Sequence, residues 1–166
     1  MSRLELAVAQ IVAARDYTLW LLDSVPADEW FWSPSGTATH VAWQVGHLAM
    51  AQFSLTLLRM RGERHEDDRL ISSDFLAAFG RDSSPRLDSA SYPPVDEIRA
   101  TFDRVHRQAL IELVDIPDDV LDEPLARPHR ICKTKNDALW WCSRHEMLHA
   151  GQIGLLRRLA GHPPLW

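Results

Sequence analysis

The sequence predicts an all-α protein, a four-helix bundle with long connections, and three observations lead to this fold class. Four stretches of the 166-residue chain repeat apolar residues at helical spacing. Residues that start or stop helices flank these stretches. No stretch shows the strict alternation of apolar and polar residues that indicates a strand. Four long amphipathic helices in a small chain bury their apolar faces against one another, so we expect residues 1–166 to form a single bundle domain.

The first two helices are expected over residues 3–24 and 37–61. Thr37 or Thr39 is a suitable N-cap for the second helix, because a hydroxyl can accept a hydrogen bond from a free backbone N–H of the first turn. Gly62 follows its far end, where glycine commonly ends a helix. The apolar face of the first helix is formed by Leu4, Ala7, Val8, Ile11, Ala14, Thr18 and Leu22.

The third and fourth helices are expected over residues 94–115 and 136–160. Thr134 followed by Asp137 resembles a capping box at the start of the fourth helix, and Gly161 follows its end. The apolar face of the third helix is formed by Val95, Ile98, Phe102, Val105, Ala109 and Leu113.

The connections between these helices are unusually long for a small bundle. They cover residues 25–38, 63–93 and 116–133, and a short helix is expected at Ser73–Phe79 within the second. Loops of this length are often functional when they lie over a site. We therefore expect the 63–93 connection to shape the specificity of any site in the bundle.

The composition excludes several classes of protein. Apolar residues make up 46% of the chain and charged residues 25%, which is a globular composition. The net charge of −5 argues against a nucleic-acid-binding surface. Neither a signal peptide nor a membrane span is evident, and Cys132 and Cys142 do not form a secreted disulfide framework. We expect a soluble, cytoplasmic protein.

The most informative motif lies in the fourth helix, where His145 and His149 are four residues apart. Their rings lie one turn apart on the same face, a spacing that suits two ligands of one transition metal. The stripe that contains them is apolar at both ends and polar in the middle, and buried polar groups need partners. Its members are Ala138, Trp141, Cys142, His145, His149, Gln152, Leu156 and Leu159.

A third histidine can join this pair from the second helix. His47 lies within a mostly apolar face, so we expect its side chain to point into the bundle. His47, His145 and His149 would form a three-histidine metal site with open coordination positions, as catalytic metals require. His40 lies on the same face but two turns away, roughly 10 Å along the axis, too far to share the ion easily. Ordinary core histidines bonded to backbone carbonyls are the alternative interpretation.

The same segment reads H-E-x-x-H, the zinc-protease signature, yet we disfavour a peptidase. The longer protease motif needs a glycine and a histidine downstream, and Gln152 and Leu155 occupy those positions. His162 is the only candidate ligand after His149. No edge strand is evident that could hold a peptide substrate.

Several neighbouring residues are candidates for supporting roles. Gln152 lies one turn past His149 and could bond to a ligand water or to a neighbouring helix. Glu146 borders the histidine stripe and could act as a base, although an ion-paired or solvated carboxylate is the simpler interpretation. Trp43 and Trp141 flank the site as pocket walls or as ordinary core. Cys142 is expected to be a buried, inert thiol, with a fourth-ligand role as the lesser alternative.

Two segments together resemble the DinB/YfiT-like superfamily, in the branch known as DinB-like domain 2. These are HVAWQVGHLA at residues 40–49 and HEMLHAGQI at 145–153, followed by RRLAGHP at 157–163, and SYP at 91–93 also fits. The resemblance spans nearly the whole chain. It implies a four-helix bundle that holds a divalent metal on three histidines, at positions 47, 145 and 149 of this chain. It also implies kinship with thiol transferases that use glutathione, mycothiol or bacillithiol, with a maleylpyruvate isomerase, and with the metal-bearing domains of sulfoxide synthases.

The leading functional hypothesis is a metal-dependent transferase that activates a low-molecular-weight thiol for attack on a small electrophile. A metal-hydroxide hydrolase of a small substrate and a non-catalytic, stress-associated metal- or ligand-binding bundle remain as alternatives. Histidine ligation fits zinc, nickel, iron or copper, and among these we expect zinc, with nickel or iron as the alternatives.

We also expect a homodimer, because the last helix is apolar on a second face and carries small residues there that permit close approach of another helix. These residues are Trp140, Met147, Ala150, Gly151 and Gly154.

Overall fold

The computed structural model describes residues 1–35, 39–114 and 116–165, and it is all-α over these residues, as predicted. The α-helices are Arg3–Leu22 (α1), Val41–Gln52 (α2), Arg59–Arg61 (α3), Asp67–Leu70 (α4), Ser73–Phe79 (α5), Val95–Leu113 (α6) and Lys135–Leu159 (α7). A π-helical stretch, Phe53–Leu58 (η2), joins α2 to α3, and short 3-10 turns lie at Ala27–Glu29 (η1), Ser89–Ser91 (η3) and Asp118–Asp122 (η4).

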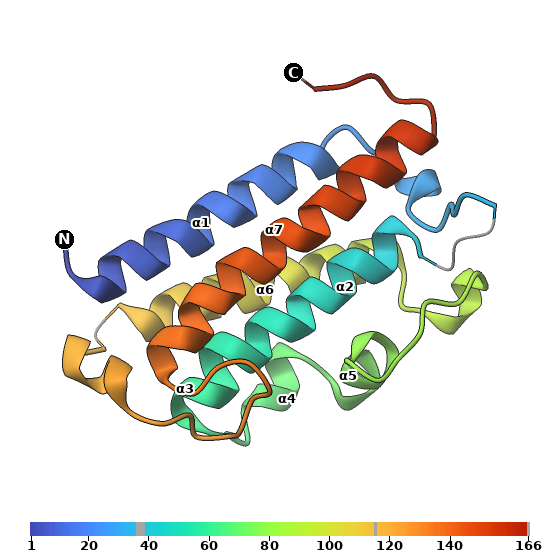
Figure 1. Cartoon of the computed structure of the whole chain (residues 1–166). Coiled ribbons are helices and arrows are strands. Elements are labelled where there is room, and N and C mark those ends of the chain that lie inside the picture. Colours follow the sequence, from blue (N-terminus) through green and yellow to red (C-terminus); the bar gives the residue numbers. More distant parts are fainter. Residues whose placement is uncertain (36–38, 115, 166) are drawn as a thin grey trace.

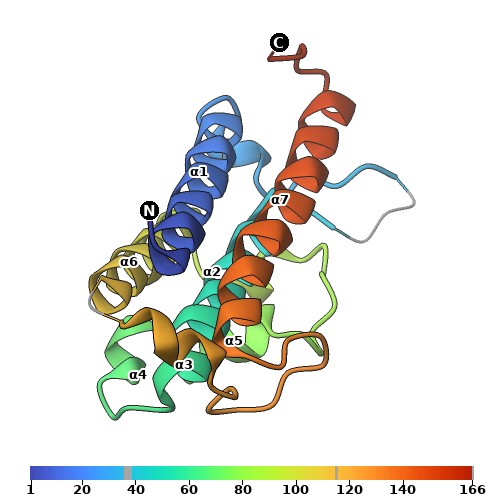
Figure 2. The same ribbon diagram turned by 60° about the vertical axis from the view of Figure 1, so that its left-hand side comes forward.

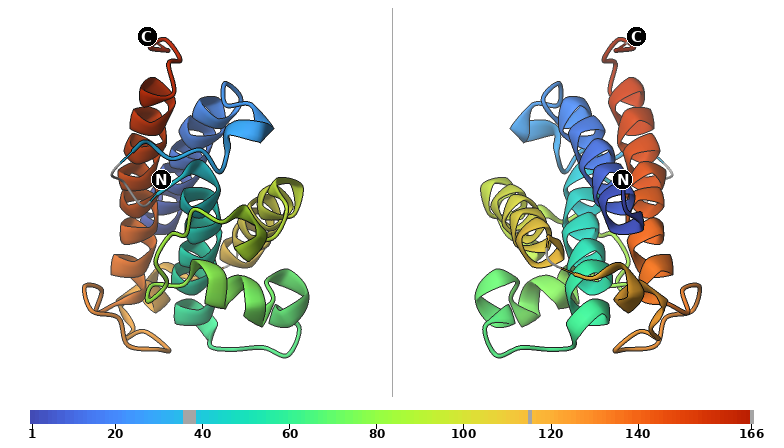
Figure 3. Two further views of the ribbon diagram at one scale, coloured as in Figure 1. Left: turned by 90° about the vertical axis from the view of Figure 1, so that its right-hand side faces the viewer. Right: turned by 90° about the vertical axis from the view of Figure 1, so that its left-hand side faces the viewer.

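The four long helices α1, α2, α6 and α7 form the bundle (Figures 1 and 2). Helix α1 lies along α7, and α2 contacts both α6 and α7. Helices α1 and α7 run in one direction, whereas α2 and α6 run in the other (Figure 1). Because α2 and α6 are parallel, the chain between them must return along the length of the bundle. This requirement explains the long connection, which carries α4 and α5 along the side of the bundle (Figure 3).

Both the first and the last helix begin with the caps that their sequences favour. The Ser2 hydroxyl accepts from the Glu5 N–H, and the Glu5 carboxylate accepts from the Ser2 N–H. The expected capping box of α7 is confirmed by the same reciprocal pair between Thr134 and Asp137. Each box satisfies backbone donors that the first turn of a helix leaves free.

The second helix begins later than predicted, at Val41 rather than at residue 37. Thr37 lies outside the described residues, and Thr39 is not the cap. The N-cap is His40, whose Nδ1 accepts a hydrogen bond from the Trp43 N–H at 3.1 Å. An imidazole nitrogen thus replaces the usual hydroxyl or carboxylate oxygen, which is why the standard cap signals pointed to the threonines.

A buried ion pair lies inside the bundle between α1 and α7. Arg15 and Glu146 are 1% and 2% exposed, and the Arg15 Nε donates to a Glu146 carboxylate oxygen at 2.8 Å. The same guanidinium also donates to the Gln52 side chain and to the Phe102 carbonyl, at 2.7 Å and 2.9 Å. These contacts compensate the cost of burying two charges and link α1, α2, α6 and α7 at one level.

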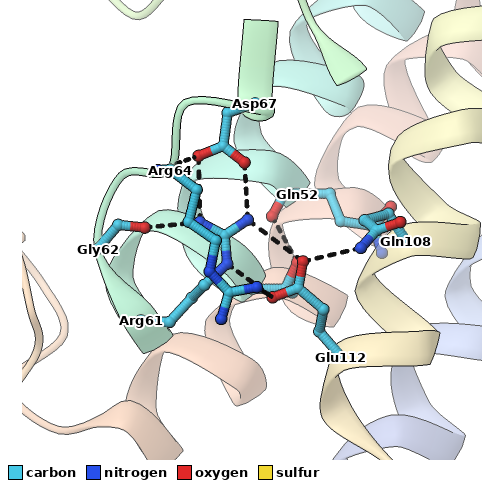
Figure 4. A network of polar contacts seen from close by, with 8 residues as sticks. Gln52, Arg61, Gly62, Arg64, Asp67, Gln108 and Glu112 are labelled. Carbon is cyan, nitrogen blue, oxygen red and sulfur yellow. Dashed lines mark hydrogen bonds and ion pairs between the residues drawn. The ribbon is translucent and has the colours of Figure 1, made fainter. Parts of the chain in front are cut away.

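A second polar network ties the chain after η2 to α6 (Figure 4). Arg61 donates to Asp67 at 2.7 Å and to Glu112 at 2.6 Å, and Glu112 also accepts from Gln108 and Arg64. The network anchors the start of the crossover connection against the bundle.

Over the described residues, no helix is both long enough and apolar enough to cross a bilayer.

Candidate metal centre

The structure brings His47, His145 and His149 together from α2 and α7. Their ring centroids are 4.5 to 5.3 Å apart, and their potential ligand nitrogens all lie within 4.8 Å of one another. The two helices pack directly against each other, so the inward stripes predicted from the sequence meet at this level. The three residues form a group that could hold a metal ion.

His47 is fixed from its outer side. Its Nδ1 lies 2.9 Å from the carbonyl oxygen of Phe79, the last residue of α5, and must carry a hydrogen to donate to that oxygen. Trp43 stacks on the ring with centroids 4.7 Å apart and planes only 14° apart. The indole N–H of Trp43 donates to the Ser83 hydroxyl at 3.3 Å. The crossover connection therefore orients this histidine and leaves its Nε2 facing the cluster.

His149 is fixed by a chain of two glutamines. Its Nδ1 is hydrogen-bonded to the Gln44 side-chain oxygen, an arrangement that places the hydrogen on Nδ1. The Gln44 amide nitrogen donates to Gln152 at 2.8 Å and to Thr39 at 2.7 Å. Gln152, a candidate from the sequence, therefore bonds to Gln44 on the neighbouring helix and is linked to His149 through that residue.

The inward-facing nitrogens have a spacing that suits a metal. With their Nδ1 atoms donating outward, His47 and His149 present Nε2 lone pairs to the interior. The Nε2 atoms of His149 and His145 are 3.2 Å apart. Two nitrogens bound tetrahedrally to one zinc ion at 2.0–2.1 Å would be about 3.3 Å apart. Outer partners that fix the tautomer in this way are characteristic of metal-binding histidines.

Burial lowers the pKa of all three imidazoles and so favours their uncharged form. Burial, with contributions from His47 and His129, lowers the pKa of His145 to about 4. Burial, with contributions from His145 and His47, lowers the pKa of His149 to about 3. Burial also lowers the pKa of His47. At neutral pH all three rings are uncharged, which is the form that coordinates metals. His47 and His149 are 8% and 9% exposed, and the partly exposed His145 lies nearest to solvent.

Glu146 does not face the histidines. Its carboxylate is held by Arg15 in the buried ion pair between α1 and α7. In a zinc protease with this motif, the glutamate serves as the general base. Here that carboxylate is already bound on the other side of the helix, so the geometry differs from that of the protease site.

Trp141 and Cys142 lie one turn before His145 and differ in their surroundings. The Trp141 ring centroid is 6.0 Å from that of His145, which makes it a wall beside the more exposed ligand candidate. The Cys142 thiol is buried in a hydrophobic cluster that also contains Ala138 and Leu139. Burial strongly raises its pKa, so the thiol stays protonated. It lies outside the group of potential ligands.

His40 is held away from the cluster by two structural contacts. Its Nδ1 caps α2, and its Nε2 lies 3.0 Å from the Arg86 carbonyl oxygen. The prediction that it would not join the three histidines agrees with its absence from the potential ligand group.

Sequence reasoning missed Gln44 and the Phe79 carbonyl, the two groups that orient His149 and His47. Gln44 did offer a signal, since a polar residue inside an otherwise apolar buried stretch must have hydrogen-bond partners. A backbone carbonyl offers none, because any residue at position 79 would supply it.

The fold and the histidine cluster agree with the family comparison. The DinB superfamily model matches residues 10–153, which is most of the chain. A comparison with curated proteins gives no significant match. The chain therefore belongs to the DinB superfamily.

Proposed function

We propose that the protein binds one divalent transition metal through His47, His145 and His149, with zinc preferred and nickel or iron as alternatives. The observation that carries this proposal is the convergence of three uncharged imidazoles whose outer nitrogens, in His47 and His149, are occupied by Phe79 and Gln44. Three protein ligands leave positions for water or substrate, as in catalytic metal sites.

The proposed reaction is the transfer of an electrophilic group to a low-molecular-weight thiol. Bound at this site, the metal would act as a Lewis acid that lowers the pKa of a coordinated thiol. In the overall reaction the thiol loses its proton, its sulfur forms a bond to carbon of the electrophile, and the leaving group departs with its electron pair. Trp43 and Trp141 would flank the reactants. The choice of thiol transfer as the reaction is supported by the thiol transferases that the family resemblance implies.

The test is metal analysis of protein purified without a histidine tag, followed by a thiol conjugation assay. We expect about one metal ion per chain and a conjugation rate above that of metal-free protein with at least one of several thiols. H145A and H149A should lose both metal and activity. H162A is the matched control, because His162 contacts Glu29 outside the cluster.

Other results would select among the alternatives. Metal retention without conjugation by any thiol would favour a non-catalytic metal- or ligand-binding bundle. Hydrolysis of small esters by the metal-loaded protein, lost in H145A, would favour a hydrolase. Failure of the tag-free protein to bind any divalent metal would refute the proposal.

A cytoplasmic homodimer is part of the proposal. The free thiols Cys132 and Cys142 suit a reducing compartment. Ala150 and Gly154, two of the small residues expected at the dimer contact, pack within the single chain instead. Ala150 is buried, and Gly154 lies against Leu21 of α1. The support for a dimer therefore comes from the exposed apolar residues of α7.

Leu148 and Leu155 are 59% and 58% exposed on that helix, and Met147 is 45% exposed. A second copy packed on this face would remove their apolar surface from water. We expect light scattering to give a dimer for the wild type and a monomer for L148E. A monomeric wild type would remove this part of the proposal.

A further inference from the structure

A polar pocket of about 410 Å³ lies outside the histidine cluster, between the short helix α4 and the long helix α6. Pockets of this size take small molecules. Four arginines line it, namely Arg61, Arg64, Arg69 and Arg104. With three acidic residues in the same lining, the pocket has a net charge of +1 on a chain whose net charge is −5. The pocket is therefore a local excess of positive charge on an acidic protein.

Two of the three acidic residues are fully engaged with arginines (Figure 4). The Arg61 guanidinium donates to both oxygens of Asp67, at 2.7 and 3.1 Å, and to both oxygens of Glu112, at 2.6 and 3.2 Å. A bond to the Gly62 carbonyl at 2.7 Å uses the last N–H group of this guanidinium. Arg64 adds its backbone N–H to Asp67 and its Nη1 to Glu112. Both carboxylates are therefore occupied, and Arg61 is a saturated part of the pocket wall.

Arg104 lies on α6 and keeps one terminal nitrogen without a partner. Its Nε donates to the Leu70 carbonyl at 2.9 Å, and its Nη2 donates to the Thr101 hydroxyl at 2.9 Å. The contact of Nη2 with Glu97 is long, at 3.4 Å, and such an exposed ion pair is weak. Among the described residues, Nη1 forms no hydrogen bond. These contacts fix the guanidinium and leave Nη1 available to a ligand.

Arg64 and Arg69 supply further free donors. Over the described part of the chain, the Arg69 side chain on α4 forms no hydrogen bond or ion pair. Arg64 uses only Nη1 of its guanidinium, which leaves Nε and Nη2. Glu66 is the third acidic residue of the lining, and its side chain has no partner within the same described ranges. Three guanidinium groups with free donors thus outnumber one unpaired carboxylate.

We propose that Arg64, Arg69 and Arg104 bind the phosphate group of a small phosphate monoester in this pocket. A phosphate monoester carries a charge of about −1.5 to −2 at pH 7 and has three strong acceptor oxygens, one for each guanidinium. A carboxylate has only two oxygens and a single charge. Guanidinium forks bind phosphate oxygens in pairs. Leu70 and Thr101 already hold Arg104 in place, which reduces the entropy cost of binding.

The first experiment is an NMR titration of the full chain with glycerol 3-phosphate, with inorganic phosphate and glycerol as comparisons at constant ionic strength. The backbone amide resonances of residues 64–70 and the side-chain Nε–H resonance of Arg104 report on the pocket. We expect saturable shifts with glycerol 3-phosphate, weaker binding of inorganic phosphate because it lacks the organic part, and no shift with glycerol. No saturable shift with glycerol 3-phosphate would overturn the site. Equal or tighter binding of inorganic phosphate would overturn the assignment to a monoester.

Four variants test the residues of the pocket. R69Q removes a charge without removing a structural contact, because the exposed Arg69 side chain contacts no partner among the described residues. R69Q and R104Q should each weaken glycerol 3-phosphate binding about three- to tenfold. E66Q should tighten it, because the unpaired carboxylate is removed. R99Q is the matched control on α6, where Arg99 pairs with Asp23, and it should bind as the wild type does. Unchanged affinity in the R69Q/R104Q double variant would overturn the proposal.

Repeating the titration with a chelator separates this pocket from the proposed metal centre. We expect the same affinity and the same shifted resonances with and without chelator, because no lining residue of the pocket belongs to the histidine group. Loss of binding with chelator would show that phosphate binds at a metal instead and would overturn the site. The proposed function and the phosphate site can therefore fail independently of each other.

Discussion

Gly46 is a position where one added methyl group should be costly. It immediately precedes His47, and a Cβ built there would lie 2.4 Å from Cδ1 of Phe79 and 2.5 Å from two further ring carbons. Ordinary contacts between carbons are about 3.5–4.0 Å. The Phe79 ring is fully buried, so it cannot move into solvent to relieve the overlap.

Two opposing effects set the size of the loss in G46A. Alanine stabilises a helix by about 1 kcal/mol relative to glycine. Overpacking a close-packed core typically costs about 1–3 kcal/mol and occasionally more. With an overlap of this size against a fixed ring, we expect the steric cost to win, for a net loss of about 1–3 kcal/mol. Because the Phe79 carbonyl orients His47, displacing Phe79 should also weaken metal binding.

Urea denaturation of G46A and G151A gives a matched comparison. A Cβ at Gly151 would meet nothing within 4 Å, so G151A should gain up to about 1 kcal/mol from helix propensity alone. Chelator competition then measures metal affinity, which should fall in G46A and stay unchanged in G151A. If G46A is as stable as G151A, the packing argument at Phe79 is wrong.

Three further predictions follow from the contacts around the site and in the core. Q44A removes the hydrogen-bond acceptor of His149 and should weaken metal binding about 10–100-fold in chelator competition, whereas Q108A should not. R15M leaves Glu146 buried without its partner and should cost about 3–5 kcal/mol in urea denaturation, whereas R15M/E146L should recover most of that loss; equal stability of the two variants would contradict this account. Burial, with a contribution from Arg15, lowers the pKa of His106 to about 4. The unfolded chain therefore binds more protons at this residue between about pH 4 and 6.5, so the contribution of His106 is complete above pH 6.5 and is lost as the pH falls to 4. In H106Q, the free energy of unfolding should therefore fall by about 2 kcal/mol less between pH 6.5 and 4, after allowance for the partial exposure of His106. The same pH dependence in H106Q and the wild type would contradict the lowered pKa of His106.

Local sequence signals predicted the long helices well because each signal acts within a few residues. The expected helix at 136–160 forms at Lys135–Leu159, and the short helix Ser73–Phe79 has the bounds predicted. Where a local signal was unusual, the prediction failed, as at the histidine N-cap of α2. The last helix also departs from its predicted stripe at Leu159, which is 52% exposed because it lies in the final turn near the C-terminus.

The sequence by itself determined the all-α fold class, the superfamily motifs and the inward faces that carry His47, His145 and His149. Helical periodicity encodes which face of a helix is apolar, and that was sufficient to expect the cluster. Only the tertiary structure decided the partners of these faces. Glu146 bonds to Arg15 across 131 residues, and Gln44 bonds to Gln152 across 108. Such pairs depend on the relative rotation and height of packed helices, which no short stretch of sequence specifies.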